Sequence, residues 1–263
     1  MLSRRIALCV VAAPMAVLLS APAASAARVG DFNAVAHRGY HRHHTENTLG
    51  ALRAARRAGA TGMETDLRLS RDGHFVVMHD PRLRRTTTCR GAVARHTRHW
   101  IRHHCRAEDG SRIPTAGEML HAAHRANLNL MLDLKTDPRH RWTKHRFRML
   151  KRTIFARHMQ DRVMLISRGG DRLRKAEAVA PGLKTMWISK HAPSVRSVHR
   201  RADEVSVLAD VISRRYVNRM NDAGIRVYGR RNNRPHAWHW FQWAGVAGTI
   251  TDAIRRFTRW ESR

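Results

Sequence analysis

The chain has 263 residues, of which 50 are Lys or Arg and 20 are Asp or Glu, so its formal net charge is +30 at pH 7. No linker-like, repetitive or charge-blocked stretch divides it, and its length argues against a second core. The charge favours polyanionic partners, but it is spread along the chain and does not choose among nucleic acid, lipid headgroups, wall polymers and small phosphodiesters.

Residues 1–26 have the features of an export signal. Arg4 and Arg5 precede an apolar run, and Ala24-Ser25-Ala26 supplies a small-residue cleavage pattern. Pro14 interrupts the run, which is shorter than the ~20 apolar residues of a bilayer span, and this disfavours an uncleaved anchor. We therefore expect cleavage near Ala26, one mature domain over 27–263, and a secreted, extracellular protein.

The cysteines fit the same expectation. Cys9 would leave with the signal, and Cys89 and Cys105 would remain. An even pair in an exported protein favours one disulfide, with two unrelated buried thiols as the alternative.

From residue 33 onward, short apolar runs alternate with helical patterns, which is typical of parallel strands joined by crossover helices. Eight strands predict a closed (β/α)8 TIM barrel, and Asp72-Gly73 predicts a small hairpin extension, Phe75–His79, after the second strand. An open doubly wound sheet is disfavoured, because no Gly-x-Gly-x-x-Gly loop follows the first strand. The expected strands are Ala34–His37, Met63–Leu69, Leu128–Leu134, Val163–Ser167, Lys184–Ile188, Glu204–Leu208, Ile225–Tyr228 and Gly248–Thr251.

Acidic residues lie near the carboxyl ends of the predicted strands, where barrel active sites form. Glu64 and Asp66 are two apart on one strand and should share a face, and Asp133 ends the next parallel strand. Unpaired, three such carboxylates would repel one another, so a bound cation is expected. Oxygen ligands without a thiolate favour Ca²⁺ or Mg²⁺ over zinc.

The same strand ends carry groups suited to a phosphodiester. Arg38 and Lys135 could bind phosphate oxygens beside the metal. His37 and His79 could serve as general acid and base, although the residues alone do not say which takes which role.

Six short motifs follow one another along the chain: His37-Arg38-Gly39, Glu46-Asn47-Thr48, Glu64-Thr65-Asp66, Asp72-Gly73 with His79-Asp80, Ile113-Pro114-Thr115 and Asp133-Leu134-Lys135, with a weaker echo at Gly245–Gly248 and Thr251-Asp252. In this order they resemble the signature of the glycerophosphodiester phosphodiesterase family. The resemblance implies a barrel of the phospholipase-C-like type, a divalent metal on Glu64, Asp66 and Asp133, and acid–base catalysis by His37 and His79. The expected activity is hydrolysis of glycerophosphodiesters, or of polyglycerol-phosphate polymers, to glycerol 3-phosphate and an alcohol.

Two rival functions remain open. Asp133 stands where this family usually has glutamate, and Asp133-Leu134-Lys135 is also similar to the sphingomyelinase D-like phospholipases, which act on intact lipids. An inert polycation that binds wall or membrane anions is the third reading. In each case we expect a monomer, electrostatic association with anionic surfaces, and no specific nucleic-acid partner.

Three further groups have competing interpretations. Glu46 and Asn47 could cap the first helix, or Asn47 could contact the phosphate, as the family resemblance implies. A cluster of histidines at 41, 43 and 44 matches no common metal spacing and is expected to be a polar loop. The aromatic run Trp238, Trp240, Phe241 and Trp243 could grip a headgroup, enter a membrane interface, or simply pack on the barrel.

Overall fold

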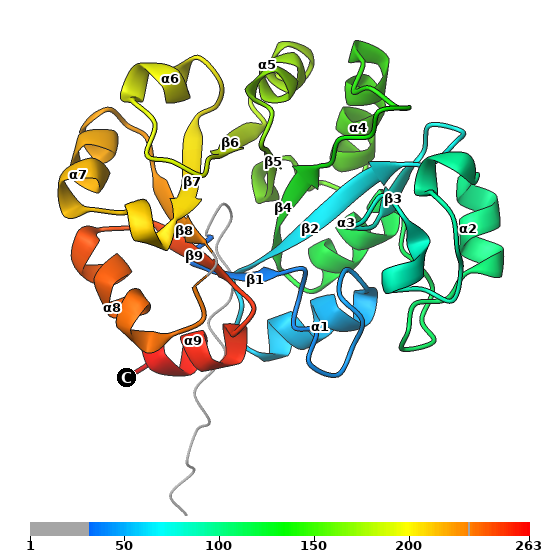
Figure 1. The fold of residues 1–263 in the computed structure, drawn as a ribbon, viewed down its shortest axis with the longest axis horizontal. Coiled ribbons are helices and arrows are strands. Elements are labelled where there is room, and N and C mark those ends of the chain that lie inside the picture. The colour runs from blue at the N-terminus through cyan, green and yellow to red at the C-terminus, as the bar shows by residue number, and fades with distance from the viewer. Residues whose placement is uncertain (1–31, 231) are drawn as a thin grey trace, which may run out of the picture.

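The computed structural model describes residues 32–230 and 232–263, and the expected export signal lies outside them. Eight parallel strands pair in the order β1-β9-β8-β7-β6-β5-β4-β2, and a β1–β2 pairing closes the ring. The predicted barrel is therefore confirmed, with helices surrounding it (Figure 1). Its strands are β1 (Ala34–His37), β2 (Gly62–Leu69), β4 (Asn129–Leu134), β5 (Val163–Ser167), β6 (Lys184–Ile188), β7 (Glu204–Leu208), β8 (Val227–Arg230) and β9 (Gly248–Thr251).

The ninth strand, β3 (Phe75–Val77), forms the predicted hairpin with the end of β2. It pairs antiparallel, with Leu67 opposite Val77 and Leu69 opposite Phe75. Gly73 in the turn has φ +74°, a conformation that glycine adopts without a steric penalty. The hairpin lengthens β2 beyond the barrel wall, beside the carboxyl ends of the strands.

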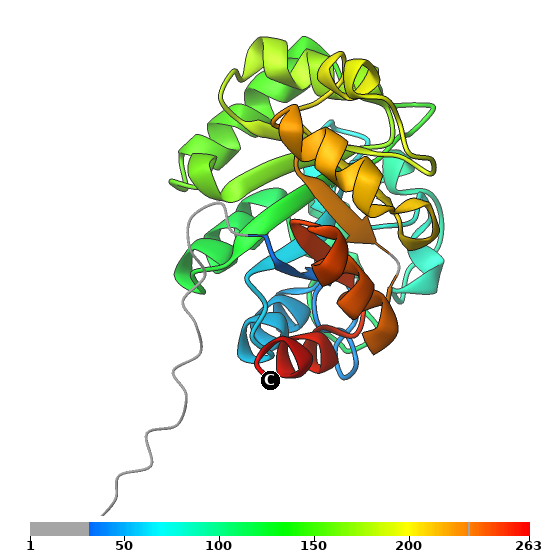
Figure 2. The same cartoon turned by 90° about the vertical axis from the view of Figure 1, so that its left-hand side faces the viewer.

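Helices follow the strands around the ring, as Figure 2 also shows from the side. Most begin at a Thr or Ser whose side chain accepts a hydrogen bond from the first turn, as Thr48, Thr115 and Thr143 do. The helical segments are α1 (Leu49–Arg57), η1 (Leu83–Arg85), η2 (Val93–Arg95), α2 (Arg98–His104), α3 (Ala116–Arg125), α4 (Lys144–Phe155), η3 (Gln160–Arg162), α5 (Gly170–Val179), α6 (Val195–His199), η4 (Ala209–Val211), α7 (Arg214–Asp222), α8 (Pro235–Ala244) and α9 (Ile254–Glu261).

One strand prediction was displaced. The strand expected at Ile225–Tyr228 lies at Val227–Arg230, because Ile225 closes the end of α7 with a hydrogen bond from its amide to the Met220 carbonyl. Ile225 is buried among the apolar residues between α7 and the barrel. Its apolar character therefore reflects packing of the helix end and not a position within the strand.

The two faces of the barrel strands pack into two different apolar cores. Leu130, Leu132 and Leu134 of β4 pack outward against the helices, whereas Met131 belongs to a cluster with Met164 and residues of other strands. The inward face of β2 and β4 therefore carries the polar residues Glu64, Asp66 and Asp133 toward the barrel interior. Among the described residues, no helix has the length and apolarity to cross a membrane.

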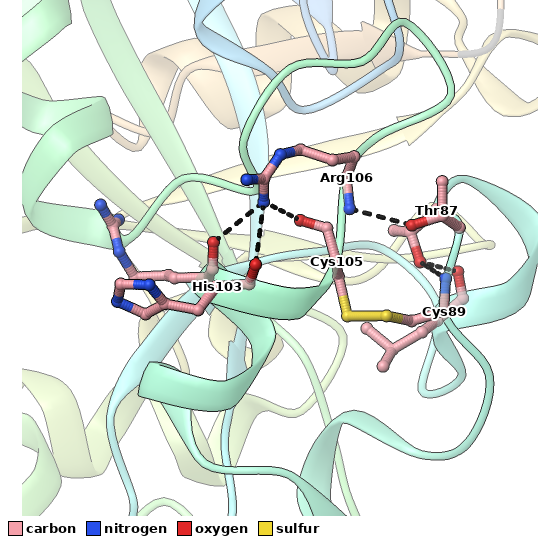
Figure 3. Close-up of a disulfide and its surroundings, with 8 residues drawn as sticks. Thr87, Cys89, His103, Cys105 and Arg106 are labelled. Carbon is pink, nitrogen blue, oxygen red and sulfur yellow. Dashed lines mark hydrogen bonds between the residues drawn. A yellow bond between two sulfur atoms is a disulfide. The ribbon is translucent and has the colours of Figure 1, made fainter.

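The segment between β3 and α3 forms a small lobe with its own apolar cluster, which includes Leu83, Val93 and Ile101. Cys89 and Cys105 form the predicted disulfide within it, with their Cα atoms 5.4 Å apart. Figure 3 shows the disulfide beside Arg106, whose guanidinium donates to carbonyls at the end of α2. The lobe is therefore held by a covalent bond as well as by its small core.

Candidate active site

The register of β1, β2 and β4 brings the predicted acidic and basic residues to one end of the barrel. His37 lies opposite Glu64, and Asp66 lies opposite Asp133. Residues that lie directly opposite each other on two paired strands point to the same face of the sheet, as do residues two apart on one strand. The side chains of these four residues therefore converge. They meet at the carboxyl ends of the strands, as the barrel rule predicts.

Glu64, Asp66 and Asp133 are buried, and one oxygen of each lies within 4.8 Å of the others. Lys135 Nζ pairs with both aspartates, at 2.7 Å from Asp66 Oδ1 and 2.5 Å from Asp133 Oδ2. Three buried carboxylates whose oxygens converge within 4.8 Å fit a hard divalent cation, whose ligands are oxygens. Among the described residues this is the one group of three or more acidic, histidine or cysteine side chains that could hold a metal.

The electrostatics of this triad point the same way. Burial, followed by the charge of Asp66, raises the pKa of Glu64 to about 8. Burial likewise raises the pKa of Asp133. Burial would also raise the pKa of Asp66, but Lys135, His79 and Arg38 outweigh it and lower that pKa. The three carboxylates thus bring more negative charge to this point than the neighbouring cations neutralise. A divalent cation would compensate for the excess.

Asn47 holds Asp66 in place from the loop that precedes α1. Its side chain is buried, and its amide nitrogen donates to Asp66 Oδ2 at 2.7 Å. Its Oδ1 accepts from the Thr65 hydroxyl at 2.7 Å and from the Asp66 amide at 3.1 Å. The helix cap is Thr48, so the interpretation of Asn47 as a cap was wrong. Its assignment to the phosphate stays a prediction, and Asn47 does not line the cavity described below.

The backbone around Asn47 is strained. Arg38 and Asn47 have φ of 56° and 62°, and the Asn47 amide donates to the Arg38 carbonyl at 3.0 Å. Left-handed backbone at residues other than glycine is uncommon and concentrates at functional sites. Here it turns the Arg38 amide toward Glu64 Oε2, which accepts from it at 3.2 Å.

Both histidines have a carboxylate at Nδ1. His37 Nδ1 lies 2.7 Å from Asp252 Oδ1, and His79 Nδ1 lies 2.6 Å from Asp80 Oδ1. A carboxylate at Nδ1 fixes the ring orientation and leaves Nε2 for another partner. His37 Nε2 lies 3.9 Å from Glu64 Oε2, so the ring reaches the acidic triad.

The surroundings shift the pKa values of the two imidazoles in opposite directions. Burial lowers the pKa of a histidine, but at His37 the Asp252 hydrogen bond and the charge of Glu64 outweigh burial and raise it. At His79 burial prevails over Asp66 and Asp80, and the pKa is lowered. A pair of titrating groups with separated pKa values is the usual arrangement of an acid and a base.

A chain of ion pairs connects His79 to the triad. Arg85 Nε donates to Asp80 Oδ2 at 2.5 Å, and the Arg85 guanidinium also binds Glu46 at 2.6 Å. Glu46 in turn accepts from Arg38 at 3.1 Å, and Arg38 Nε lies 3.5 Å from Asp66. Sequence reasoning missed Arg85, which lies in the short η1 turn, and no motif marks it.

Asp252 was missed as a functional residue in the same way. It was seen only as part of a weak motif echo, yet it directly follows the last strand of a barrel whose strand ends form the site. Its position at a strand end was the signal that could have identified it.

These residues open onto a cavity of about 360 Å³. His37, Arg38, Glu64, His79, Asp133 and Lys135 all line it. Arg68, Arg168, Arg172 and Arg230 add positive charge that the sequence did not reveal, and Ile166, Ile188 and Ile250 add an apolar part.

The cavity arginines are held largely by neutral acceptors. Arg68 donates to the carbonyls of His79 and Thr136, and Arg172 donates to the Leu134 carbonyl and the Ser167 hydroxyl. Such bonds fix the guanidinium groups without neutralising them. The cavity can therefore attract an anion.

A sequence profile of the Glycerophosphoryl diester phosphodiesterase family matches residues 37–256. The chain belongs to this family. It is 39% identical over 111 residues to mouse glycerophosphodiester phosphodiesterase 1, an alignment that covers 39% of this chain and 34% of the mouse protein. The aligned region therefore spans about a third of that relative.

Solved structures of the family share the fold. A phosphodiesterase of Oleispira antarctica, in complex with the product sn-glycerol-3-phosphate, aligns with TM-score 0.76 and 21% identity over 88% of this chain and 97% of that one. A glycerophosphodiester phosphodiesterase of Agrobacterium tumefaciens aligns with TM-score 0.74 and 21% identity over 86% of this chain and 98% of that one. At such identity the likeness concerns the fold.

The remaining sequence candidates are not part of the triad, although His41 Nε2 lies 4.0 Å from Asp252 Oδ1. His41 Nδ1 is 3.1 Å from the Gly39 carbonyl and His44 faces Asp109, so the histidine loop forms no metal cluster among the described residues. Of the aromatic run, Trp238 and Phe241 are buried, whereas Trp240 and Trp243 are exposed.

Proposed function

We propose that this chain hydrolyses glycerophosphodiesters to glycerol 3-phosphate and an alcohol, with one divalent cation, Ca²⁺ or Mg²⁺. The observation that carries the proposal is the placement of two carboxylate-backed histidines, His37 and His79, in one cavity with a buried acidic triad. The glycerol 3-phosphate bound to the Oleispira relative supports the same product here.

The side chains divide the work by their chemistry. Glu64, Asp66 and Asp133 would hold the cation, which supplies Lewis-acid stabilisation of phosphate charge. Arg38 and Lys135 add fixed positive charge for the phosphate oxygens. One histidine takes a proton from the attacking oxygen, a new P–O bond forms, and the bond to the departing alcohol breaks as the other histidine supplies it with a proton.

The surroundings of the cavity extend the proposal to polyglycerol-phosphate substrates. A second hollow shares Thr136 and Arg172 with the cavity, and its wall includes Arg141 and Lys175. Asp137 and Asp171 also line it, so its charge is mixed but carries more cationic than acidic side chains. A chain of phosphodiesters could pass from one hollow into the other. Faster turnover of glycerophosphate oligomers than of glycerophosphocholine, lost in Lys175→Ala, would support this extension.

We further propose that the protein is exported, loses residues 1–26 and acts as an extracellular monomer. The Cys89–Cys105 disulfide supports export, because such bonds persist mainly in oxidising compartments. The net charge of +30 supports association with anionic wall or membrane surfaces instead of one specific nucleic-acid partner.

The decisive experiment is release of glycerol 3-phosphate from glycerophosphocholine by the purified protein, with and without a chelator. His37→Ala and His79→Ala should each lower kcat by about 10²- to 10⁴-fold, the usual contribution of a general acid or base. His121→Ala, which removes an exposed histidine of α3, is the matched control and should be fully active.

Other outcomes favour the rival functions. Turnover of micellar sphingomyelin or lysophospholipid, but not of glycerophosphocholine, would support the sphingomyelinase D-like alternative. No turnover with any divalent ion, together with salt-sensitive binding of polyanions that survives both histidine substitutions, would support the inert polycation.

A further inference from the structure

Helix α8 turns two tryptophans outward. Trp240 and Trp243 are 41% and 52% exposed, and their rings stack with centroids 4.7 Å apart. The opposite face of the helix packs on the barrel through Trp238 and Phe241, which are buried in its apolar clusters. Adjacent exposed aromatic rings of this size commonly mark an interaction surface.

The two rings are held in place. Trp240 Nε1 donates to the Ile212 carbonyl at 3.1 Å, and the Arg214 guanidinium lies 5.1 Å from the centre of the Trp243 ring. We call Trp240, Trp243 and Arg214 the tryptophan patch. Because its side chains are already ordered, binding through them would lose little conformational entropy.

The patch lies on the outer side of the barrel, where α7 and α8 contact each other (Figure 1). Ile212 follows η4, which directly follows the carboxyl end of β7. Helices α7 and α8 contact each other, and Figures 1 and 2 show them side by side on the outer ring. Trp243 precedes the last residue of α8, Ala244, from which the chain enters the amino end of β9. A surface bound at the patch would therefore face the outer side of the barrel.

The charge around the patch selects the partner. Arg214, Arg215 and Arg219 of α7 are exposed, and α8 contains no acidic residue. Asp210 and Asp222 are the exposed acids at the two ends of this region, so cations outnumber them. Tryptophan favours the bilayer interface, and arginine favours anionic headgroups. The combination fits an anionic phospholipid surface.

We propose that the tryptophan patch docks the protein on anionic phospholipid bilayers, with Trp240 and Trp243 entering the headgroup region and Arg214 binding lipid phosphates. This surface is separate from the catalytic cavity and does not depend on the proposed hydrolysis. It would hold the barrel on a membrane from which lipid-derived phosphodiesters are released.

The test is cosedimentation with vesicles of phosphatidylglycerol and phosphatidylcholine at about 0.15 M salt, where exposed charges are screened beyond about 8 Å. The double variant Trp240→Ala/Trp243→Ala should bind about ten-fold or more weakly than the unmodified protein. Phe155→Ala is the matched control, because Phe155 is 42% exposed on α4 with Lys151 Nζ 5.5 Å from its ring centre. It should bind like the unmodified protein.

A second measurement uses vesicles with brominated acyl chains, which should quench tryptophan fluorescence in the unmodified protein but not in the double variant. Equal thermal midpoints of the unmodified protein and the double variant would show that the variant is folded. This control does not depend on the activity assay. Equal binding by the double variant, loss of binding in Phe155→Ala as well, or binding to single-stranded nucleic acid in place of vesicles would each overturn the proposal.

Discussion

Asp252 Oδ1 lies at hydrogen-bond distance, 2.7 Å, from Nδ1 of His37, although the two residues are 215 positions apart in the sequence. Strands β1 and β9 are neighbours in the closed barrel, and this pairing brings the two ends of the domain together. Asp252 therefore acts as a positioning residue for one of the two proposed catalytic histidines.

Replacing Asp252 with Asn should lower kcat about 10- to 100-fold, the usual cost of removing a partner that orients a functional group. KM should change little. Burial would raise the pKa of Asp252, but the hydrogen bond from His37 outweighs it and lowers that pKa to about 2. Because the side chain is partly exposed, the thermal midpoint should fall only modestly. Steady-state kinetics with glycerophosphocholine measure the effect. A variant that loses stability as much as kcat would show that the contact is structural.

A second prediction concerns the acidic triad. Ca²⁺ or Mg²⁺ should raise the thermal midpoint, because a ligand at a hundred times its Kd stabilises the folded state by about 2.7 kcal/mol. Asp133→Asn should abolish this rise, whereas Asp133→Glu should retain it with an altered ion preference. Glu204→Gln is the control, since Glu204 is a buried carboxylate paired with Arg226 at 2.6 Å and lies outside the triad. A metal-induced rise that persists in Asp133→Asn would contradict the assignment.

The barrel and the strand-end residues could be predicted from sequence because both depend on local patterns. Alternating residues on a strand share a face, so the convergence of Glu64 with Asp66 follows from spacing alone. The disulfide could also be predicted, because the chain leaves two cysteines after the expected signal.

The partners of these residues could not be predicted. Arg85 contacts Asp80 five residues earlier in the same segment, but it reaches Glu46 only because the lobe folds back on the β1–α1 loop, and nothing local encodes that second contact. The period of α8 indicates that Trp240 and Trp243 share a face, but which face packs on the barrel depends on neighbouring helices. Ile225 was assigned to a strand because an apolar residue at a helix end looks the same as one in a strand.

A third prediction tests whether Asn47 positions Asp66 or contacts the phosphate. Asn47→Gly removes the side chain without adding strain at φ 62°. If Asn47 positions Asp66, metal affinity should fall about 10- to 100-fold, and the free energy of unfolding should fall by about 1–3 kcal/mol because buried partners lose their hydrogen bonds. Calorimetric titration measures the first and denaturant unfolding the second. A raised KM with unchanged metal affinity would favour contact with the phosphate instead.

The disulfide should contribute substantially to stability. The two cysteines are 16 residues apart, and closing a loop of that size stabilises a protein by about 3 kcal/mol. Cys89→Ser/Cys105→Ser should therefore lower the free energy of unfolding by about that amount. A reductant should destabilise the unmodified protein equally and leave the double variant unaffected. Insensitivity of both proteins to the reductant would show that the bond does not stabilise the fold.

The last prediction is a pH dependence of stability that arises from Asp80. Its hydrogen bonds from Arg85 and His79 outweigh burial and lower its pKa to about 2, from the ordinary 3.8. A carboxylate with a lowered pKa stabilises the fold fully above its unfolded value, and the contribution is lost as the pH falls toward the folded value. Because the group is partly exposed, the contribution should be about 0.5–1 kcal/mol.

Asp80→Asn should therefore be less stable than the unmodified protein by a constant amount above about pH 5, and the difference should shrink as the pH falls below about 4. Thermal midpoints at closely spaced pH values between these limits measure the difference. Asp210→Asn removes one exposed negative charge elsewhere and controls for net charge. A difference that stays constant or widens toward low pH would mean that the ionised form of Asp80 is not what stabilises the fold, and that its role is confined to orienting His79.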